Sequence, residues 1–324
     1  MGAIWVIAET NADGSLARSA AEAATLARSL AAASGREARG LVVSVDPGRA
    51  GGELAAYLGR VVTVTEPGAA DHAWAVIAAE RAAGLLGDDP SAIVLLSASP
   101  DGRDLAGTLS ALTPLGVLAN ATAVTWDGRV AVEMSTFGGK LTTTSGFTGD
   151  GGIITLRPNA VTAEPAAARG VVEAAAAGAA PALPRVTIAE RVAEASAALP
   201  IEEARVIVSG GRGVGGPEGF DLVGELAALL GGAVGASRAA VDAGWIPYAR
   251  QIGQTGKIVK PQLYLALGIS GAIQHKVGMQ TAETIIAVNR DPDAPIAAFA
   301  DLLVVGDLFE VVPAVVRALQ ERPG

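Results

Sequence analysis

The sequence contains no cysteine and only two histidines, His72 and His275. Disulfide frameworks, iron–sulfur clusters and zinc–thiolate sites are therefore excluded, because each of them depends on cysteine. Two histidines are also too few for a histidine-rich metal site. We therefore predict no metal centre, and any redox chemistry of this protein requires a bound organic cofactor.

Charged residues are scarce, at 18% of the chain, and the 33 acidic residues outnumber the 24 basic ones, for a net charge of -9. This balance argues against binding to nucleic acid, which needs basic side chains to neutralise phosphates. The apolar run at residues 3–8 has no preceding Lys or Arg, so it is typical of a first strand and not of a signal peptide. Asp301, Asp307 and Glu310 interrupt the apolar C-terminal stretch, which argues against insertion into a membrane. We expect a cytoplasmic protein.

A length of 324 residues and a hydrophobic fraction of 50% predict two folded domains. In the first half, short runs rich in β-branched residues alternate with alanine-rich stretches such as residues 16–33, whose apolar positions follow helical spacing. This alternation predicts a parallel α/β sheet. The expected strands are residues 4–8, 41–45, 61–65 and 93–97.

The pattern changes after residue 123. Expected strands at residues 123–126, 130–136, 140–144 and 153–156 are separated by Asp127-Gly128, Gly138-Gly139 and Asp150-Gly151-Gly152, which are typical of hairpin turns. We therefore predict an antiparallel appendage to the first sheet. Residues 163–200 are rich in Ala, Gly and Pro, and within them we place the boundary between an N-terminal domain, 1–195, and a C-terminal domain, 196–324.

The alternation of strands and helices returns after the boundary. Strands are expected at residues 205–208, 233–235, 262–267, 284–288 and 301–305, and helices at residues 220–230 and 311–319. This order predicts a doubly wound parallel sheet, which binds ligands at the carboxyl ends of its strands. Those ends carry glycine and polar residues but neither a carboxylate pair nor a GxSxG nucleophile. They predict a nucleotide-like ligand and no catalytic residues.

The first of these corners contains Gly211, Gly213 and Gly216 in the spacing GxGxxG. Such a loop lets backbone N–H groups approach a pyrophosphate at a helix N-terminus, and the alternative is a tight turn in a glycine-rich protein. The next corner has Ser237 and Arg238 where an NAD site has an acidic residue. An NADP-dependent dehydrogenase, with Arg238 on the 2′-phosphate, is therefore an alternative function.

Two further corners carry polar side chains. Residues 251–257, QIGQTGK, depart from a phosphate-binding P-loop at both ends, but their amides and hydroxyl suit the edge of a planar heterocycle. A polar surface turn is the alternative. Residues 268–275, GISGAIQH, place small residues where a ligand can approach closely, and His275 is either a ligand contact or a structurally satisfied histidine. Turn and N-cap chemistry also explain Asn289 and Asp307 at the last corners.

Taken in order, these motifs resemble one family. The succession of residues 209–213 (SGGRG), 235–244 (GASRAAVDAG), 251–257, 268–275, 289–295 (NRDPDAP) and 306–313 (GDLFEVVP) is similar to the FAD domain of the electron-transfer flavoprotein α subunit. The motifs that carry the resemblance lie in the C-terminal domain. The N-terminal domain fits this family in length and α/β character.

The resemblance implies a heterodimer with an electron-transfer flavoprotein β subunit that carries AMP or a second FAD. FAD would be held mainly by the C-terminal domain, and the N-terminal domain would pack against the partner. The function implied is that of an electron carrier, not of an enzyme with its own substrate site. Electrons would come from flavin dehydrogenases, such as the acyl-CoA dehydrogenases of fatty acid β-oxidation, and would pass to a quinone oxidoreductase. A regulatory nucleotide-binding module is a third possibility.

The resemblance also implies roles for individual residues. Arg238 would lie over the isoalloxazine, Thr255 would face its N5/O4 edge, and His275 would face its O2 side. Arg212 would contact the pyrophosphate. The full set of implied cofactor-binding residues is Arg212, Gly213, Ser237, Arg238, Gln251, Gln254, Thr255, Gly268, Ser270, Gly271, Gln274, His275, Asn289, Asp307 and Leu308. A guanidinium and an imidazole donor near the ring would stabilise the negative charge of the reduced flavin and raise its reduction potential.

Overall fold

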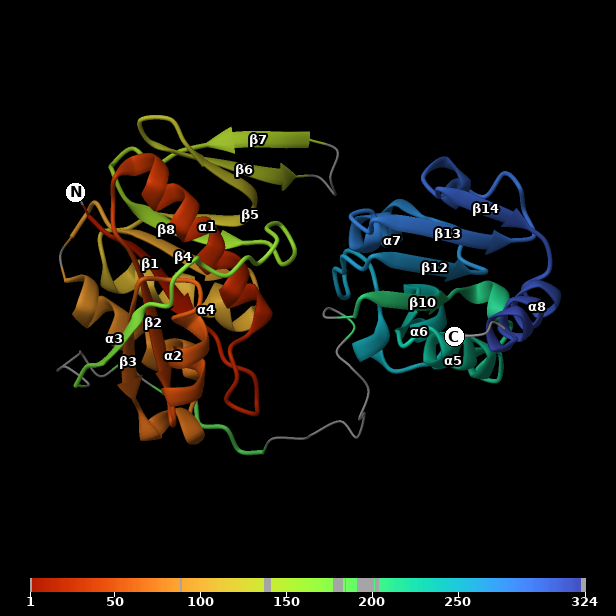
Figure 1. The fold of residues 1–324 in the computed structure, drawn as a ribbon, viewed down its shortest axis with the longest axis horizontal. Helices are drawn as coiled ribbons and strands as arrows, with labels where there is room; N and C mark the ends of the chain where they lie inside the picture. Colours follow the sequence, from red (N-terminus) through yellow and green to blue (C-terminus); the bar gives the residue numbers. More distant parts are fainter. Residues whose placement is uncertain are drawn as a thin grey trace. The chain divides into compact units, whose positions relative to one another are not determined.

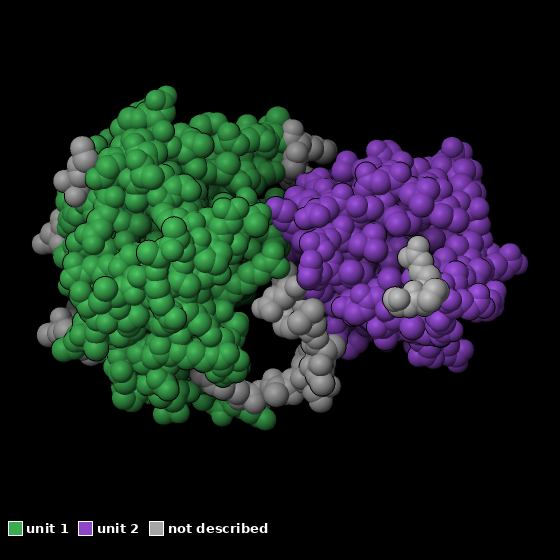
Figure 2. Space-filling model, in the orientation of Figure 1, with its two compact units in different colours: residues 1–193 green, residues 194–324 purple. Residues whose placement is uncertain are grey.

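The computed structural model describes residues 2–87, 89–136, 141–176, 183, 185–190, 201 and 204–321. The chain divides into two compact units, Met1–Ala193 and Glu194–Gly324, which Figure 2 colours separately. The predicted Gly138-Gly139 turn and the predicted boundary near residue 195 lie outside the described residues. Each unit is built around one sheet, so each is described by itself.

The sheet of the first unit has nine strands within the described residues, in the order β7-β6-β5-β8-β4-β1-β2-β3-β9 (Figure 1). The strands are β1 (Ile4–Ala8), β2 (Ala38–Ser44), β3 (Arg60–Thr65), β4 (Ile93–Ser97), β5 (Val117–Trp126), β6 (Val130–Thr136), β7 (Leu141–Ser145), β8 (Gly152–Leu156) and β9 (Val171–Ala174). The helices are α1 (Arg18–Ser34), α2 (Gly48–Leu54), the short 3-10 helix η1 (Pro67–Ala70), α3 (Trp74–Leu86) and α4 (Pro100–Leu112).

Helices cover both faces of the central strands of this sheet. Because side chains alternate along a strand, Ile4 and Val6 of β1 pack with α1 and α2, whereas Trp5 and Ile7 pack with α3 and α4. Strands β4, β1, β2 and β3 pair in parallel, while β5 with β6 and β6 with β7 pair antiparallel. The predicted parallel sheet with an antiparallel appendage is therefore confirmed, but the hairpin predicted at Asp150-Gly151-Gly152 is wrong: β8 pairs in parallel with β4 and β5 and not with β7. Turn residues indicate a loop but do not determine which strand the following run pairs with.

One strand of this sheet was not predicted. Strand β9 lies within the stretch that the sequence indicated as a connection, and it runs parallel to β3, with Val171 paired to Arg60 and Ala174 to Thr63. All four of its residues are exposed, and Glu173 forms an ion pair with Arg60 at 2.9 Å. A short edge strand without buried alternate residues has no hydrophobic periodicity, so composition alone could not reveal it.

In the part of the second unit that the structure describes, five parallel strands form a sheet in the order β11-β10-β12-β13-β14. The strands are β10 (Val206–Gly210), β11 (Ala233–Ala236), β12 (Leu263–Leu267), β13 (Thr284–Asn289) and β14 (Leu302–Val305). The helices are η3 (Arg212–Val214), α5 (Gly219–Leu229), α6 (Arg238–Asp242), η4 (Tyr248–Arg250), α7 (Ile273–Met279), η5 (Pro295–Ala298) and α8 (Leu308–Gln320), where η marks 3-10 helices.

This second sheet is also covered on both faces, which confirms the predicted doubly wound fold. Val208 and Leu267 pack with α5 and α8, whereas Ile207 and Ala266 face Met279 of α7 and the η5 segment. From β10 the chain crosses first to β11 on one side and then to β12 on the other. Such a reversal opens a crevice at the carboxyl ends of the two strands. None of the described helices is long and apolar enough to cross a membrane.

Candidate functional site

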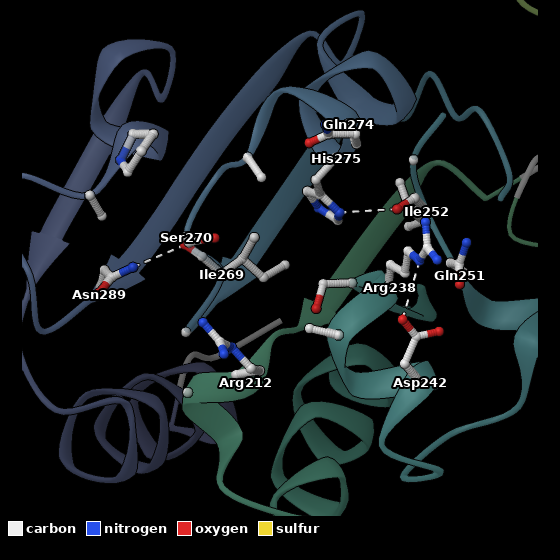
Figure 3. A pocket seen from close by; sticks show the side chains of 18 of the residues that line it. Arg212, Arg238, Asp242, Gln251, Ile252, Ile269, Ser270, Gln274, His275 and Asn289 are labelled. Atoms are coloured by element: carbon white, nitrogen blue, oxygen red, sulfur yellow. Dashed lines mark hydrogen bonds and ion pairs between the residues drawn. The ribbon is translucent and has the colours of Figure 1, made fainter. Parts of the chain in front are cut away.

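A cavity of about 570 Å³ lies at the carboxyl ends of β10, β11, β12 and β13 (Figure 3). Its volume is within the range of sites for organic ligands. Most of the predicted cofactor-binding residues line it: Arg212, Gly213, Ser237, Arg238, Gln251, Gln254, Thr255, Gly268, Ser270, Gln274, His275 and Asn289. The fold therefore brings together residues from five separate corners of the second unit.

Three of the predicted residues do not line this cavity. Gly271 has φ 83°, and a Cβ there would lie 2.5 Å from the Cα of Ile296, so its role is to let two backbone segments approach. Asp307 accepts a hydrogen bond from the N–H of Phe309 at 2.9 Å and caps α8, and Leu308 is buried in the core. The Phe309 N–H and the Arg290 guanidinium hold the pKa of Asp307 below its usual range. Direct contact of Gly271, Asp307 and Leu308 with a cofactor stays a prediction.

The glycine-rich corner after β10 packs against the corner after β12. The N–H of Gly211 donates to the carbonyl of Leu267 at 2.9 Å, and that of Gly213 donates to the carbonyl of Gly268 at 3.0 Å. A Cβ on Gly213 would lie 2.6 Å from the Cα of Gly268. Gly211 and Gly213 thus satisfy their N–H groups within the protein, and backbone packing between two corners explains these two glycines. The third glycine of the GxGxxG spacing, Gly216, has open space around an added Cβ and takes no part in this packing. Arg212 remains on the cavity wall.

Sequence reasoning missed Asp242, which also lines the cavity. Its Oδ2 lies 3.2 Å from Nε of Arg238, one helical turn away in α6, and both side chains are largely exposed. The spacing of four residues between an arginine and a carboxylate was the available signal. A carboxylate beside Arg238 partly neutralises the guanidinium and competes with any phosphate for it. The other unpredicted lining residues are Ala239, Ile252, Gly253, Ile269, Ala272, Asp291, Ala294 and Pro295.

Two side chains, the buried Gln251 and the exposed Tyr248, hold the loop that carries Thr255. Gln251 is 2% exposed, and its Nε2 donates to Oγ1 of Thr255 at 3.0 Å. The hydroxyl of Tyr248 donates to the carbonyl of Thr255. The N–H of Gln254 donates to the carbonyl of Gln274 at 2.7 Å, which fastens the loop to α7. The loop is therefore a supported element and not the free surface turn that the sequence left open.

His275 lies in the wall of the cavity with both ring nitrogens engaged by the protein. Nδ1 lies 3.0 Å from the carbonyl oxygen of Ile252, and Nε2 lies 2.9 Å from the hydroxyl of Tyr264. Burial lowers the pKa of His275 to about 4, against the smaller opposite effect of the Ile252 carbonyl. A donor role of this imidazole toward a ligand would require one of the two contacts to break.

The pKa of His275 predicts a loss of stability in acid. Because the unfolded chain, with a histidine pKa near 6.5, binds this proton more readily than the folded chain, stability falls as pH drops from about 6.5 toward 4. We expect this group to lower the free energy of unfolding by about 2 kcal/mol between about pH 7.5 and pH 5. Urea unfolding at both pH values measures this change in the free energy of unfolding. In His275→Gln, the difference between the two pH values should become smaller. An equal pH dependence in the variant would exclude His275 as its source.

The chemistry of the lining suits an anionic ligand with a polar heterocycle. Arg212 and Arg238 supply two guanidinium groups, and the hydroxyls and amides of Ser237, Thr255, Ser270, Gln254 and Gln274 supply hydrogen-bonding groups along the cavity. Asn289 joins its corner after β13 to the corner after β12, since its Nδ2 donates to the carbonyl of Ile269 at 2.9 Å. FAD has this combination of a pyrophosphate and a flavin ring, so the residues present fit it.

Comparisons with known proteins agree with this site. Residues 4–182 match the electron transfer flavoprotein domain, and residues 200–280 match the electron transfer flavoprotein FAD-binding domain, which confirms FAD as the cofactor. The chain is 44% identical over 328 residues to the electron transfer flavoprotein subunit alpha of Mycobacterium tuberculosis (strain CDC 1551 / Oshkosh), covering 100% of both chains.

Two further relatives carry the same description. The electron transfer flavoprotein subunit alpha of Mycobacterium leprae (strain TN) is 46% identical over 264 residues, 81% of this chain and 82% of the relative. That of Bacillus subtilis (strain 168) is 53% identical over 137 residues, 42% of each chain. With a family match over most of its first unit, a second over its cavity-bearing unit and a full-length relative, the chain belongs to the electron transfer flavoprotein alpha-subunit family.

Proposed function

We propose that this chain is the α subunit of a heterodimer and accepts electrons from flavin dehydrogenases, including acyl-CoA dehydrogenases, for delivery to a quinone oxidoreductase. The family is that of an FAD-containing electron carrier. The observation that carries the proposal is the cavity at the strand ends of the FAD-binding domain, whose lining combines two arginines with a supported polar loop. A role in fatty acid β-oxidation and a cytoplasmic location belong to the same proposal.

The residues of the cavity have distinct tasks in this proposal. Arg212 binds the pyrophosphate, and Arg238 stabilises negative charge at the ring, because a cation in a partly desolvated site favours an anion beside it. Thr255, held by Gln251 and Tyr248, orients its hydroxyl toward the ring edge. Bound FAD supplies the redox chemistry itself. The protein contributes binding, orientation and charge, which is the division of work expected of a carrier.

The partner of this chain is proposed to be an electron-transfer flavoprotein β subunit that carries AMP or a second FAD. We propose that the N-terminal domain, residues 1–195, contacts that subunit and that residues 196–324 hold FAD. Family membership supports this arrangement, since the first unit matches the electron transfer flavoprotein domain and the second the FAD-binding domain. It predicts that the two subunits purify together.

An NADP-dependent dehydrogenase is the alternative, and two observations disfavour it. The FAD-binding match covers the glycine-rich corner and Arg238. Arg238 is also paired with Asp242, whose carboxylate would repel a 2′-phosphate. Tight NADPH binding without flavin absorbance would restore this alternative. A regulatory nucleotide-binding module would instead hold FAD that no dehydrogenase can reduce.

The experiment that tests the proposed function is a cofactor and electron-transfer assay on the purified heterodimer. We expect a yellow protein that releases one FAD for the α chain, together with AMP or a second FAD from the partner. Addition of an acyl-CoA dehydrogenase with its acyl-CoA should bleach the flavin absorbance, and a quinone oxidoreductase with its quinone should restore it. A colourless, nucleotide-free heterodimer with an intact fold would contradict the proposal.

A further inference from the structure

Gln251 is a polar side chain of the cofactor cavity that is almost completely withdrawn from solvent. It begins the polar loop, residues 251–257, and is 2% exposed, whereas Thr255, four residues later, is exposed at the cavity wall. The Nε2 atom of Gln251 lies 3.0 Å from Oγ1 of Thr255. Thr255 has the only side-chain hydroxyl of this loop. The buried amide is therefore directed to the one hydroxyl that the loop offers to the cavity.

The loop itself fixes both ends of this contact. The N–H of Gln251 donates to the carbonyl of Tyr248 at 2.9 Å, and its carbonyl accepts from the N–H of Lys257 at 2.7 Å. Gly256 lets the loop close over the side chain, since a Cβ there would lie 2.4 Å from the carbonyl oxygen of Gln251 and 2.9 Å from its Cγ. At the other end, the hydroxyl of Tyr248 donates to the carbonyl of Thr255. The amide and the hydroxyl are thus held in register by the main chain.

The contact determines where the proton of the Thr255 hydroxyl points. An amide nitrogen can only donate a hydrogen bond, so Oγ1 of Thr255 is the acceptor. The hydroxyl has one proton of its own, and that proton cannot point at the nitrogen that already donates to the same oxygen. Because Thr255 lines the cavity, its proton is left for an acceptor there. Thr255 therefore enters the cavity as a hydrogen-bond donor.

We propose that Gln251 is a positioning residue of the FAD site: by donating to Oγ1 of Thr255, it makes this hydroxyl a donor to the N5 atom of the flavin ring. The inference rests on the proposed function, in which Thr255 faces the ring edge, and deepens it. N5 of oxidised FAD carries a lone pair and accepts such a bond. A proton on N5 would face the proton of Thr255, so the same contact disfavours protonation of N5. Gln251 acts on the ring through Thr255.

The first test compares two cofactors on the heterodimer. In 5-deaza-FAD a C–H group replaces N5, so the cofactor keeps its size and charge but loses this acceptor. We expect the wild-type heterodimer, once stripped of FAD, to bind FAD about tenfold more tightly than 5-deaza-FAD, the size typical of one neutral hydrogen bond. Thr255→Ser should keep this preference, and Thr255→Val should lose it. Equal affinities in the wild type, which the opposite orientation of the Gln251 amide predicts, would overturn the inference, as would a preference that survives Thr255→Val.

The second test reverses the contact at Gln251. Gln251→Glu has nearly the same shape, but a carboxylate can only accept, so the Thr255 proton should turn toward it and the preference for FAD should disappear. The added charge acts on both cofactors alike and cancels in the ratio of their dissociation constants. Since burial raises the pKa of a carboxyl, the ratio is measured from about pH 6 to about pH 9 and should be near one at the alkaline end.

A matched control adds the same charge away from Thr255. Gln280 lies at the end of α7, is exposed and does not line the cavity, so Gln280→Glu should keep the full preference for FAD at every pH. If Gln251→Glu also kept the full preference at every pH, the role assigned to Gln251 would be wrong.

A third variant covers the case in which a carboxyl at this buried position prevents folding. Gln251→Met fills a similar volume without a donor, so the Thr255 hydroxyl is free among its three staggered positions and the preference should fall about threefold. Urea unfolding of each variant without cofactor shows whether its FAD-binding domain is folded. An unchanged preference in a folded Gln251→Met protein would contradict the proposal.

The two proposals fail in different ways. If the wild-type heterodimer binds neither FAD nor 5-deaza-FAD, the proposed function fails and the inference fails with it. If the heterodimer binds FAD and is reduced by a dehydrogenase but shows no preference over 5-deaza-FAD, the proposed function stands and the role of Gln251 is wrong.

Discussion

Replacing Gly268 with alanine is expected to destabilise the FAD-binding domain by about 3 kcal/mol and to abolish retention of FAD. Gly268 has φ 61°, and an added Cβ would lie 2.6 Å from the Cα of Gly213 and 3.0 Å from a side-chain carbon of Leu308. The residue thus carries both left-handed strain and a clash with backbone. Since this contact joins two corners of the cavity, its loss should open the site. Urea unfolding and flavin absorbance after gel filtration measure the two effects.

Two other glycines separate these contributions. Gly231 has the same φ of 61° but nothing within 4 Å of an added Cβ, so Gly231→Ala should cost only the strain, about 1 kcal/mol, and should retain FAD. Gly216 has open space as well and no left-handed φ, so Gly216→Ala should be close to neutral. If Gly268→Ala lost no more stability than Gly231→Ala, the close packing of the two corners would make no contribution to the stability of the FAD-binding domain.

Replacing Arg238 with alanine is expected to lower the midpoint potential of bound FAD. The guanidinium lines the cavity and favours the form of the cofactor with more negative charge. A differential interaction of about 1.4 kcal/mol corresponds to about 59 mV for one electron. The Arg238 side chain is 65% exposed, so solvent screens its charge and we expect a decrease of about 30 to 60 mV. Spectroelectrochemical titration of the heterodimer measures it.

Asp242 and a conservative variant provide the controls for Arg238. Arg238→Lys keeps the positive charge, so it should lower the midpoint potential of bound FAD by less than Arg238→Ala does. Asp242→Asn removes the carboxylate that lies 3.2 Å from Arg238, so it should shift the potential upward. Shifts of the midpoint potential in opposite directions, downward for Arg238→Ala and upward for Asp242→Asn, would indicate an electrostatic effect. An unchanged redox titration in Arg238→Ala would remove this residue from its assigned role.

Local patterns in the sequence were sufficient for both sheets, apart from the edge strand β9, and for a nucleotide-like ligand, and the resemblance of the ordered motifs to a family specified FAD. Alternating runs and turn dipeptides predicted the parallel sheet, its antiparallel appendage and the second doubly wound sheet, because hydrophobic burial and turn chemistry act over a few residues. The ordered motifs after the strands of the second unit pointed to FAD. Parallel strands end at the same edge of a sheet, so the topology alone brought Arg212, Arg238, Thr255 and His275 to one cavity.

Only the tertiary structure decided which groups these residues contact. Asp242 neutralises part of Arg238, Gly213 donates to Gly268, and the carbonyl of Ile252 with the hydroxyl of Tyr264 engages both nitrogens of His275. Each of the last two contacts joins separate strands or loops, so no spacing in the sequence encodes it. The sequence by itself determined the fold class and the kind of ligand, whereas packing between distant corners decided the protonation and charge of the side chains around it, because burial and hydrogen-bond partners set both.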